Sequence, residues 1–302
     1  MSLRQRRLHS YDERHMNLRW LPARTQPVVF YPTLSDPRFI SVTLLGGLAL
    51  NALLTPAFGR HPSQLAASIL SWVVVDALLL IFYQRVLLVP LSALVPSLAA
   101  FVLVDSPHIW PYAAVGATAM LSKHFLRIDG RHVFNPLNFG LVVGLLFFGG
   151  SIAFGVTRFG DSPWLFLWVA SLGVLVAFRS QRLDIALAYV STFLAGALAR
   201  SFLSGGRFLT VASPMTNIVF YMYAFHMMTD PKTTPDSRSH RIVFGMLVGL
   251  VDAVLRWYGV HNAPLYAIFL ILGLLPFFRK SEGRIPDSFI WKVRTVKLAE
   301  SR

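Results

Sequence analysis

Long apolar runs separated by short polar turns make up most of the chain from about residue 39 onward. The runs are continuous, whereas membrane β-strands alternate apolar and polar residues over about ten positions. Several runs approach the roughly 20 residues that cross a hydrocarbon core as a helix. The pattern therefore predicts an all-α polytopic membrane protein with about ten transmembrane helices. The expected spans are residues 39–55, 65–82, 86–104, 109–126, 136–153, 163–178, 184–203, 213–229, 242–257 and 264–279.

Composition supports this class. Of the 302 residues, 55% are hydrophobic and 14% are charged, with a mean hydropathy of +0.56. A water-soluble domain carries about 25% charged residues, so the chain has little surface suited to water. The absence of cysteine excludes disulfides, thiolate metal sites and iron–sulfur clusters.

The net charge of +14 is distributed as a topology signal. Residues 1–38 are basic and lack an apolar core, so they do not form a cleavable signal peptide. With both termini in the cytoplasm, most basic residues lie in inner loops, as the positive-inside rule requires. We therefore expect a lipid bilayer as partner and no nucleic acid, with a membrane domain at 39–279 and a basic tail at 280–302. The basic residues predicted outside are Arg60, Arg158, Arg200, Arg207 and Arg256.

Two segments share a motif. "FNPLNFGLVVGL" (134–145) and "SHRIVFGMLVGL" (239–250) both contain Phe-Gly-x-x-Val-Gly-Leu and both enter a span from the cytoplasmic side. Chance explains the similarity, because Gly-x-x-x-Gly is common in membrane helices. Duplication into two related halves also explains it, and the shared direction would then indicate a parallel repeat.

The first polar inner loop lies in "GATAMLSKHFLRIDGRHVFNPLNFG" (116–140). Lys123 and His124 end one span, where cations interact favourably with the helix dipole. Asn135 is the expected N-cap of the next helix, with Pro136 at its first position. Capping and topology charges account for most of this loop. Lys123 and Asn138 lie inside apolar runs, and we consider them candidates for lining a ligand site.

The second polar loop is "HMMTDPKTTPDSRSHR" (226–241). The chain must leave the helix at Asp230, because a proline follows it. Lys232, Thr233 and Thr234 then offer an ammonium group, hydroxyls and backbone N–H groups before the next helix. Such donors near a helix N-terminus are typical of a site for an anion or a polar ring.

With these two loops and "FGMLVGLVDAVLRWYGVHNAPLYAIFLI" (244–271), the sequence resembles the RnfD/NqrB family over much of 110–275. That family consists of membrane subunits of ion-motive electron-transport complexes that carry flavin. The resemblance implies about ten spans, a flavin (riboflavin or FMN), other electron-transport membrane subunits as partners, and the bacterial cytoplasmic (inner) membrane as location. The residues it assigns to the flavin are Lys123, His124, Asn135, Asn138, Asp230, Lys232, Thr233 and Thr234.

Many relatives attach FMN to the threonine of a Ser-Gly-Ala-Thr motif preceded by Asp. The matching segment here is "TVASPMTN" (210–217), in which Pro214 and Met215 replace Gly-Ala and no Asp precedes. A non-covalent flavin is therefore the main expectation, and covalent FMN at Thr216 is the alternative. If the flavin is not covalently bound, Ser213 is expected to be an ordinary helix N-cap.

Two acidic residues lie within predicted spans. A carboxylate at the middle of the bilayer costs at least about 2.5 kcal/mol, so each should have a partner or a function in ion movement. Asp252 has Arg256 at i+4, which favours a structural ion pair. Asp76 has no local partner, so either an ion pathway or a distant basic residue would explain it.

Two functions remain open on the sequence. The first is a flavin-binding electron-transfer subunit, with partners relaying electrons because the chain has no nucleotide-binding motif of its own, and with ion movement through Asp76 or Asp252. The second is a transporter or channel that uses the same two loops to bind a small polar or anionic solute. The aromatic segment "FYMYAFHMM" (220–228) could stack on a flavin ring, although such a stripe is more often core.

Overall fold

The computed structural model describes residues 28–30, 38–84, 86–88, 90–128, 131–154 and 163–274. This part of the chain is mostly helical (78%), with eleven α-helices and few strands. The predicted basic segments at 1–38 (apart from 28–30 and Arg38) and 280–302, and with them the location of the termini, lie outside the described residues.

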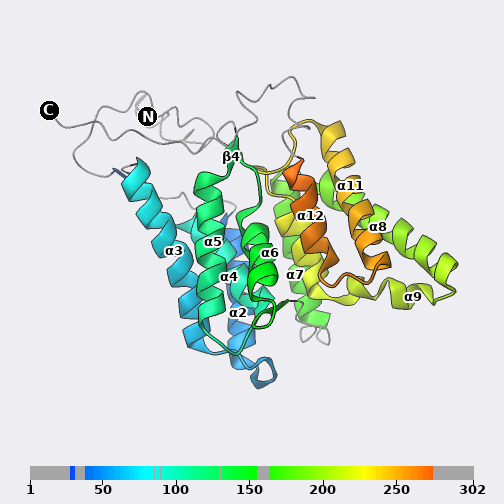
Figure 1. Cartoon of the computed structure of the whole chain (residues 1–302), viewed down its shortest axis with the longest axis horizontal. Helices are drawn as coiled ribbons and strands as arrows, with labels where there is room; N and C mark the ends of the chain where they lie inside the picture. The colour runs from blue at the N-terminus through cyan, green and yellow to red at the C-terminus, as the bar shows by residue number, and fades with distance from the viewer. Residues whose placement is uncertain are drawn as a thin grey trace.

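Five α-helices form the first half of the described chain and six form the second. The first half contains α2 (Arg38–Leu54), α3 (Pro62–Gln84), α4 (Leu91–Leu103), α5 (Trp110–Phe125) and α6 (Pro136–Phe148). The second half contains α7 (Pro163–Arg179), α8 (Leu183–Ser204), α9 (Phe208–Val211), α10 (Ile218–Met222), α11 (Arg238–Trp257) and α12 (Ala263–Gly273). Figure 1 shows the two sets as neighbouring groups, α2 to α6 on one side and α8, α11 and α12 on the other.

Short elements join the helices. The 3-10 helices are η3 (Pro56–Phe58) and η5 (Ser213–Thr216), and η6 (Tyr223–Met227) is a π-helical segment. Strand β1 (Val28–Phe30) pairs in parallel with β2 (Val86–Leu88). Strands β3 (Val104–Asp105) and β6 (Ala153–Phe154) are antiparallel, as are β4 (Arg127–Ile128) and β5 (Arg131–His132).

Each of the ten expected spans contains a helix, with two departures in detail. The span expected at 86–104 begins as strand β2 and becomes helical at Leu91. The span expected at 213–229 is divided into η5, α10 and η6. In the described residues, two helices, Pro62–Phe82 and Leu183–Ser204, are long and apolar enough to cross a membrane on their own. The number of crossings therefore stays a prediction, since a 13-residue helix such as α4 rises only about 20 Å.

The outer surface is rich in large apolar side chains. Phe202 is 89% exposed, Trp164 80% and Leu209 80%. Scattered single apolar residues are ordinary on any surface, but side chains of this size in these numbers indicate lipid or partner contact.

The helices pack in the same order in both halves. In the first half α2 packs on α4, α3 on α5, and α5 on α6; in the second, α7 packs on α10, α8 on α11, and α11 on α12. By this pattern α5 corresponds to α11. The shared motif lies in α6 in one half and in α11 in the other, and these two helices do not correspond by packing order. Whether the two halves are related, and in which direction, stays a prediction.

The shared glycines have a local packing role. A Cβ on Gly140 would lie 2.6 Å from the carbonyl oxygen of Val115 on α5. A Cβ on Gly245 would lie 2.5 Å from the carbonyl oxygen of Ile185 on α8. In both places the helix backbones approach so closely that only glycine fits.

Candidate functional site

The first polar loop is a short hairpin, β4–β5, that leads into α6. Asn135 caps α6, as predicted: its side-chain oxygen accepts a hydrogen bond from the backbone N–H of Asn138 at 3.1 Å, and Pro136 holds the first helical position. The buried ring of His132 contacts the carbonyl oxygen of Lys123 through Nδ1 at 3.0 Å. Because a carbonyl only accepts, this contact places the proton on Nδ1.

The second polar loop folds around the carbonyl group of Asp230. The hydroxyls of Thr233 and Thr234 both donate to this oxygen, at 3.3 and 2.9 Å. The side chain of Asp230 accepts from the backbone N–H of Lys232 at 3.0 Å. Both threonines are buried and their hydroxyls bind the turn itself, so in this structure they shape the loop.

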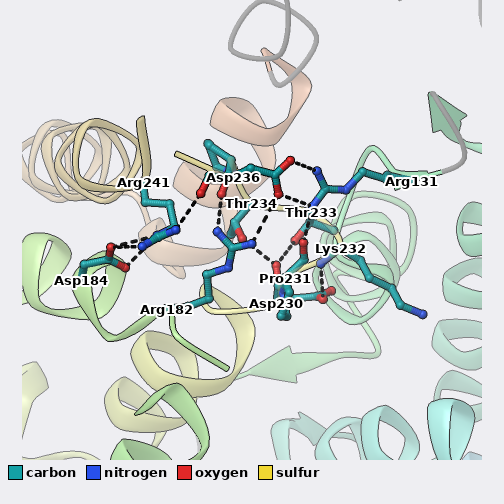
Figure 2. A network of polar contacts seen from close by, with 11 residues as sticks. Arg131, Arg182, Asp184, Asp230, Pro231, Lys232, Thr233, Thr234, Asp236 and Arg241 are labelled. Atoms are coloured by element: carbon teal, nitrogen blue, oxygen red, sulfur yellow. Dashed lines mark hydrogen bonds and ion pairs between the residues drawn. The ribbon is translucent and has the colours of Figure 1, made fainter. Parts of the chain in front are cut away.

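The two loops meet in space. The amide of Asn135 donates to the Asp230 carboxylate at 3.3 Å and to the carbonyl oxygen of Met227 at 3.4 Å. Arg131 donates to both carboxylate oxygens of Asp236, at 2.9 and 3.1 Å, and to the carbonyl oxygen of Pro231 at 2.6 Å (Figure 2). Segments about 100 residues apart therefore form one polar cluster.

A second guanidinium reaches the same cluster from the residue before α8. Arg182 donates to the carbonyl oxygen of Pro235 and lies 3.5 Å from Asp236. Beside it, Arg241 pairs with Asp184 at 2.6 Å (Figure 2). Sequence reasoning counted Arg182 and Arg241 as topology charges. Asp184 in the first turn of α8 is ordinary for a helix N-terminus, so the sequence carried no signal of these contacts.

Burial dominates the electrostatics of Asp230. It raises the pKa of this carboxyl group, against the hydrogen bonds from the Lys232 backbone and Asn135 and the charges of Arg131 and Arg182. The proton affinity of this carboxyl group therefore depends on both loops, and losing the cationic neighbours would raise it further.

Two buried polar atoms beside this cluster lack a hydrogen-bond partner among the described residues. Asn138 is fully buried, and its amide nitrogen donates to the carbonyl oxygen of Leu265 on α12 at 3.0 Å. That contact fixes the amide orientation, so the unpartnered atom is the acceptor Oδ1. The second atom is Nε2 of His226, one residue before Met227.

Aromatic rings surround the first turn of α6. Phe134 stacks on Phe269 of α12 with centroids 4.7 Å apart and planes at 16°, and Phe139 lies 5.4 Å from Phe134. In the predicted stripe, Tyr221 and Phe225 stack on each other at 6.2 Å and 10°. Phe225 belongs to the hydrophobic core, which agrees with interpreting the aromatic stripe at 220–228 as core.

Asp76 has a distant basic partner. Both its oxygens accept from the ammonium group of Lys123, at 2.9 and 3.0 Å, and His124 Nε2 lies 2.7 Å from Oδ1. Lys123 also donates to Ser92 at 3.1 Å. The side chains of Lys123 and His124 therefore bind Asp76, whereas Asn135 and Arg131 contact the Asp230 loop.

Asp252 forms the expected ion pair with Arg256, at 2.9 Å. It also accepts from the hydroxyl of Tyr189 on α8 at 2.9 Å, a partner that sequence spacing could not reveal. With both oxygens bound and the side chain fully buried, Asp252 links α8 to α11.

Thr216 lies on the exposed 3-10 turn η5, where its hydroxyl donates to the carbonyl oxygen of Ser213 at 2.7 Å. Ser213 is not an N-cap, contrary to expectation. Ala212 precedes η5, and Asn217 caps α10 by accepting from the N–H of Val219. In Figure 1, α9, directly before η5, lies towards the end of the helices opposite to β4.

A family model matches part of the chain. The model of the NQR2, RnfD, RnfE family matches residues 155–284, which include the Asp230 loop and lie after the Asn135 loop. No curated protein matches the chain. The family implies a membrane subunit of ion-translocating electron-transport complexes, which work as assemblies of several subunits. The resemblance predicted from the sequence is thus confirmed over this region: residues 155–284 carry the sequence pattern of the NQR2, RnfD, RnfE family.

Proposed function

We propose that this protein is a flavin-binding electron-transfer subunit of the bacterial cytoplasmic membrane, and that its flavin binds where the Asn135 and Asp230 loops meet. Other membrane subunits would supply and remove the electrons. The observation that carries the proposal is the fully buried, unpartnered Oδ1 of Asn138 beside this junction.

An unpaired buried polar atom costs about 1–3 kcal/mol, so native structures rarely retain one without a function. Asn138 Oδ1 can only accept, and the matching group on a flavin is the N–H between the two ring carbonyls. His226 Nε2 can donate or accept, depending on its tautomer. The residues present therefore fit the polar edge of a flavin, and the rings of Phe134 and Phe269 lie near the same helix end.

The bound flavin would supply one-electron chemistry. The chain's own residues position and tune the site. Leu265 fixes the Asn138 amide, Asn135 holds the two loops together, and Arg131 and Arg182 place positive charge near the junction. Positive charge near a flavin stabilises its reduced, anionic forms.

The test begins with the full chain purified in detergent. We expect a yellow protein with flavin absorption in the blue. Acid precipitation then separates two cases, because FMN bound covalently at Thr216 stays in the pellet whereas free riboflavin or FMN remains in solution.

The Asn138→Leu variant tests the site. It should bind flavin about tenfold more weakly, since one buried hydrogen bond is lost. Asn51→Leu is the matched control, because Asn51 on α2 also has an unpartnered side-chain oxygen among the described residues. A colourless wild-type protein that moves a small polar solute in proteoliposomes would refute the proposal and support a transporter.

A further inference from the structure

Helix α3 carries a buried polar stripe within its apolar sequence. Gln64, Ser68, Trp72 and Asp76 recur every four residues, which places them on one face of the helix. Each is at most 1% exposed, whereas Phe82 at the end of the helix is 68% exposed. The stripe faces α4 and α5, the helices on which α3 packs.

One end of the stripe meets a buried arginine. Gln64 donates to the carbonyl oxygen of Ser106 at 3.0 Å. Arg60 donates to the hydroxyl of Tyr112 and lies 3.5 Å from the Asp105 carboxylate. Asp105 is 36% exposed, so this end has access to the surface.

The middle of the stripe contains hydroxyls and an unsatisfied donor. Ser68 donates to the carbonyl oxygen of Ser97 at 2.8 Å, and Ser71 donates to that of Ser68 at 3.0 Å. The indole N–H of Trp72 has no partner among the described residues, although Trp72 is fully buried. Such a donor is usually satisfied by an ordered water.

Gly116 of α5 lets Ser71 and Trp72 pack directly against its backbone. A Cβ there would lie 2.1 Å from Ser71 Oγ and 2.9 Å from Trp72 Nε1. Any larger residue would therefore displace the hydroxyl and cover the indole N–H. The glycine therefore brings the Ser71 hydroxyl and the indole N–H to the same point on α5.

The other end of the stripe is the Asp76 cluster. The cluster contains an acid, an ammonium group and an imidazole in direct contact: Asp76, Lys123 and His124. Ser92 of α4 also binds Lys123, and Arg38 and Arg127 are further charges that act on Lys123. Lys123 can pass one proton to Asp76, which converts the ion pair into a neutral amine and a carboxylic acid.

We propose that this stripe conducts protons between the Arg60–Asp105 end and the Asp76–Lys123–His124 cluster. Hydroxyls and water both donate and accept, which proton transfer along a file requires. Sodium is disfavoured, because the Lys123 ammonium group already occupies both oxygens of Asp76 where a metal cation would bind. The coupling of this path to electron transfer rests on the proposed function; the path itself does not.

The experiment uses the full chain in liposomes that contain a pH-sensitive dye and carry a potassium diffusion potential set by valinomycin. We expect proton entry well above that of empty liposomes. Trp72→Phe removes the indole N–H but keeps an aromatic ring and the Asp76 ion pair. Proton entry should then fall about tenfold, which corresponds to raising the barrier to proton transfer by about 1.4 kcal/mol. Trp164→Phe, on the exposed surface, is the matched control and should conduct normally.

Asp76→Asn should abolish the flux, and the thermal unfolding of each variant checks that it is folded. No proton entry with the wild type, or equal entry with Trp72→Phe, would overturn the inference. Sodium entry that disappears in Asp76→Asn would overturn the choice of ion. Flavin absorbance is measured on the same samples. A yellow protein that does not conduct protons contradicts the proton path alone, whereas a colourless protein contradicts the proposed flavin function.

Discussion

At the scale of single residues, His132 makes stability depend on pH. Burial, together with the charges of Arg127 and Lys123, holds the pKa of this ring well below 6.5. The folded protein therefore keeps His132 neutral where the unfolded chain binds a proton. Stability is fully present above pH 6.5 and is lost as the pH falls towards the folded-state pKa.

The His132→Gln variant should show a weaker pH dependence of stability. In the wild type, His132 alone lowers the free energy of unfolding by up to about 1.4 kcal/mol for each pH unit below about pH 6. Thermal unfolding in detergent at about pH 7.5 and about pH 5 measures the slope. His108→Gln, at an exposed histidine, is the control; an equal change in both variants would contradict the assignment to His132.

Residue contacts close in sequence could be predicted, and those distant in sequence could not. The Asn135 cap and the Asp252–Arg256 pair follow from helical spacing. The partner of Asp76 lies 47 positions away on another helix, so no local pattern could identify it. The Ser213 cap failed because the chain turns once more before α10 begins, and Asn217 then takes the capping position.

At the scale of elements, close helix packing depends on glycine. The predicted motif was correct as a packing signal, because its glycines lie where helix backbones approach closely. The direction of the repeat stays a prediction. The sequence also gave no sign of η6, because an apolar run looks the same whether its turns contain 3.6 residues or more.

Gly245→Ala should destabilise the protein by about 1–3 kcal/mol, because its methyl group would push α11 away from Ile185 of α8. Gly46→Ala provides the control, since nothing lies within 4 Å of its added Cβ and alanine is the better helix former. Thermal unfolding in detergent compares the two. Equal midpoints would show that α8 and α11 can separate at little cost.

At the scale of the whole molecule, Asp236 connects the two halves. It pairs with Arg131 from the first half, and Arg182 of the second half lies 3.5 Å away. The family resemblance assigns residues of both loops to one flavin, which predicts that the two loops meet. The sequence did not identify Arg131 and Arg182 as the residues that join the loops, because each has the position of an ordinary inner-loop charge.

A double-mutant cycle on Arg131→Gln and Asp236→Asn should give a coupling of about 0.5–1 kcal/mol, at the low end because Asp236 is 33% exposed. The cycle on Arg241→Gln and Asp184→Asn serves as comparison within one half. Only the first cycle should lower the amount of bound flavin. Loss of flavin in both cycles would mean that general loosening, not the junction, controls binding.

The π-helical segment η6 limits how the chain length can change. Its hydrogen bond from Met228 N to the carbonyl oxygen of Tyr223, at 3.1 Å, spans five residues where an α-helix would span four. Deleting one residue within η6 would convert the wide turn into an α-helical turn and leave the following residues facing the same way. A deletion in a regular α-helical turn would instead rotate everything that follows by about 100°, and the Asp230 loop would then face lipid or the wrong helix. Natural variants of this protein should therefore lose a single residue between Asn217 and Asp230 only within η6.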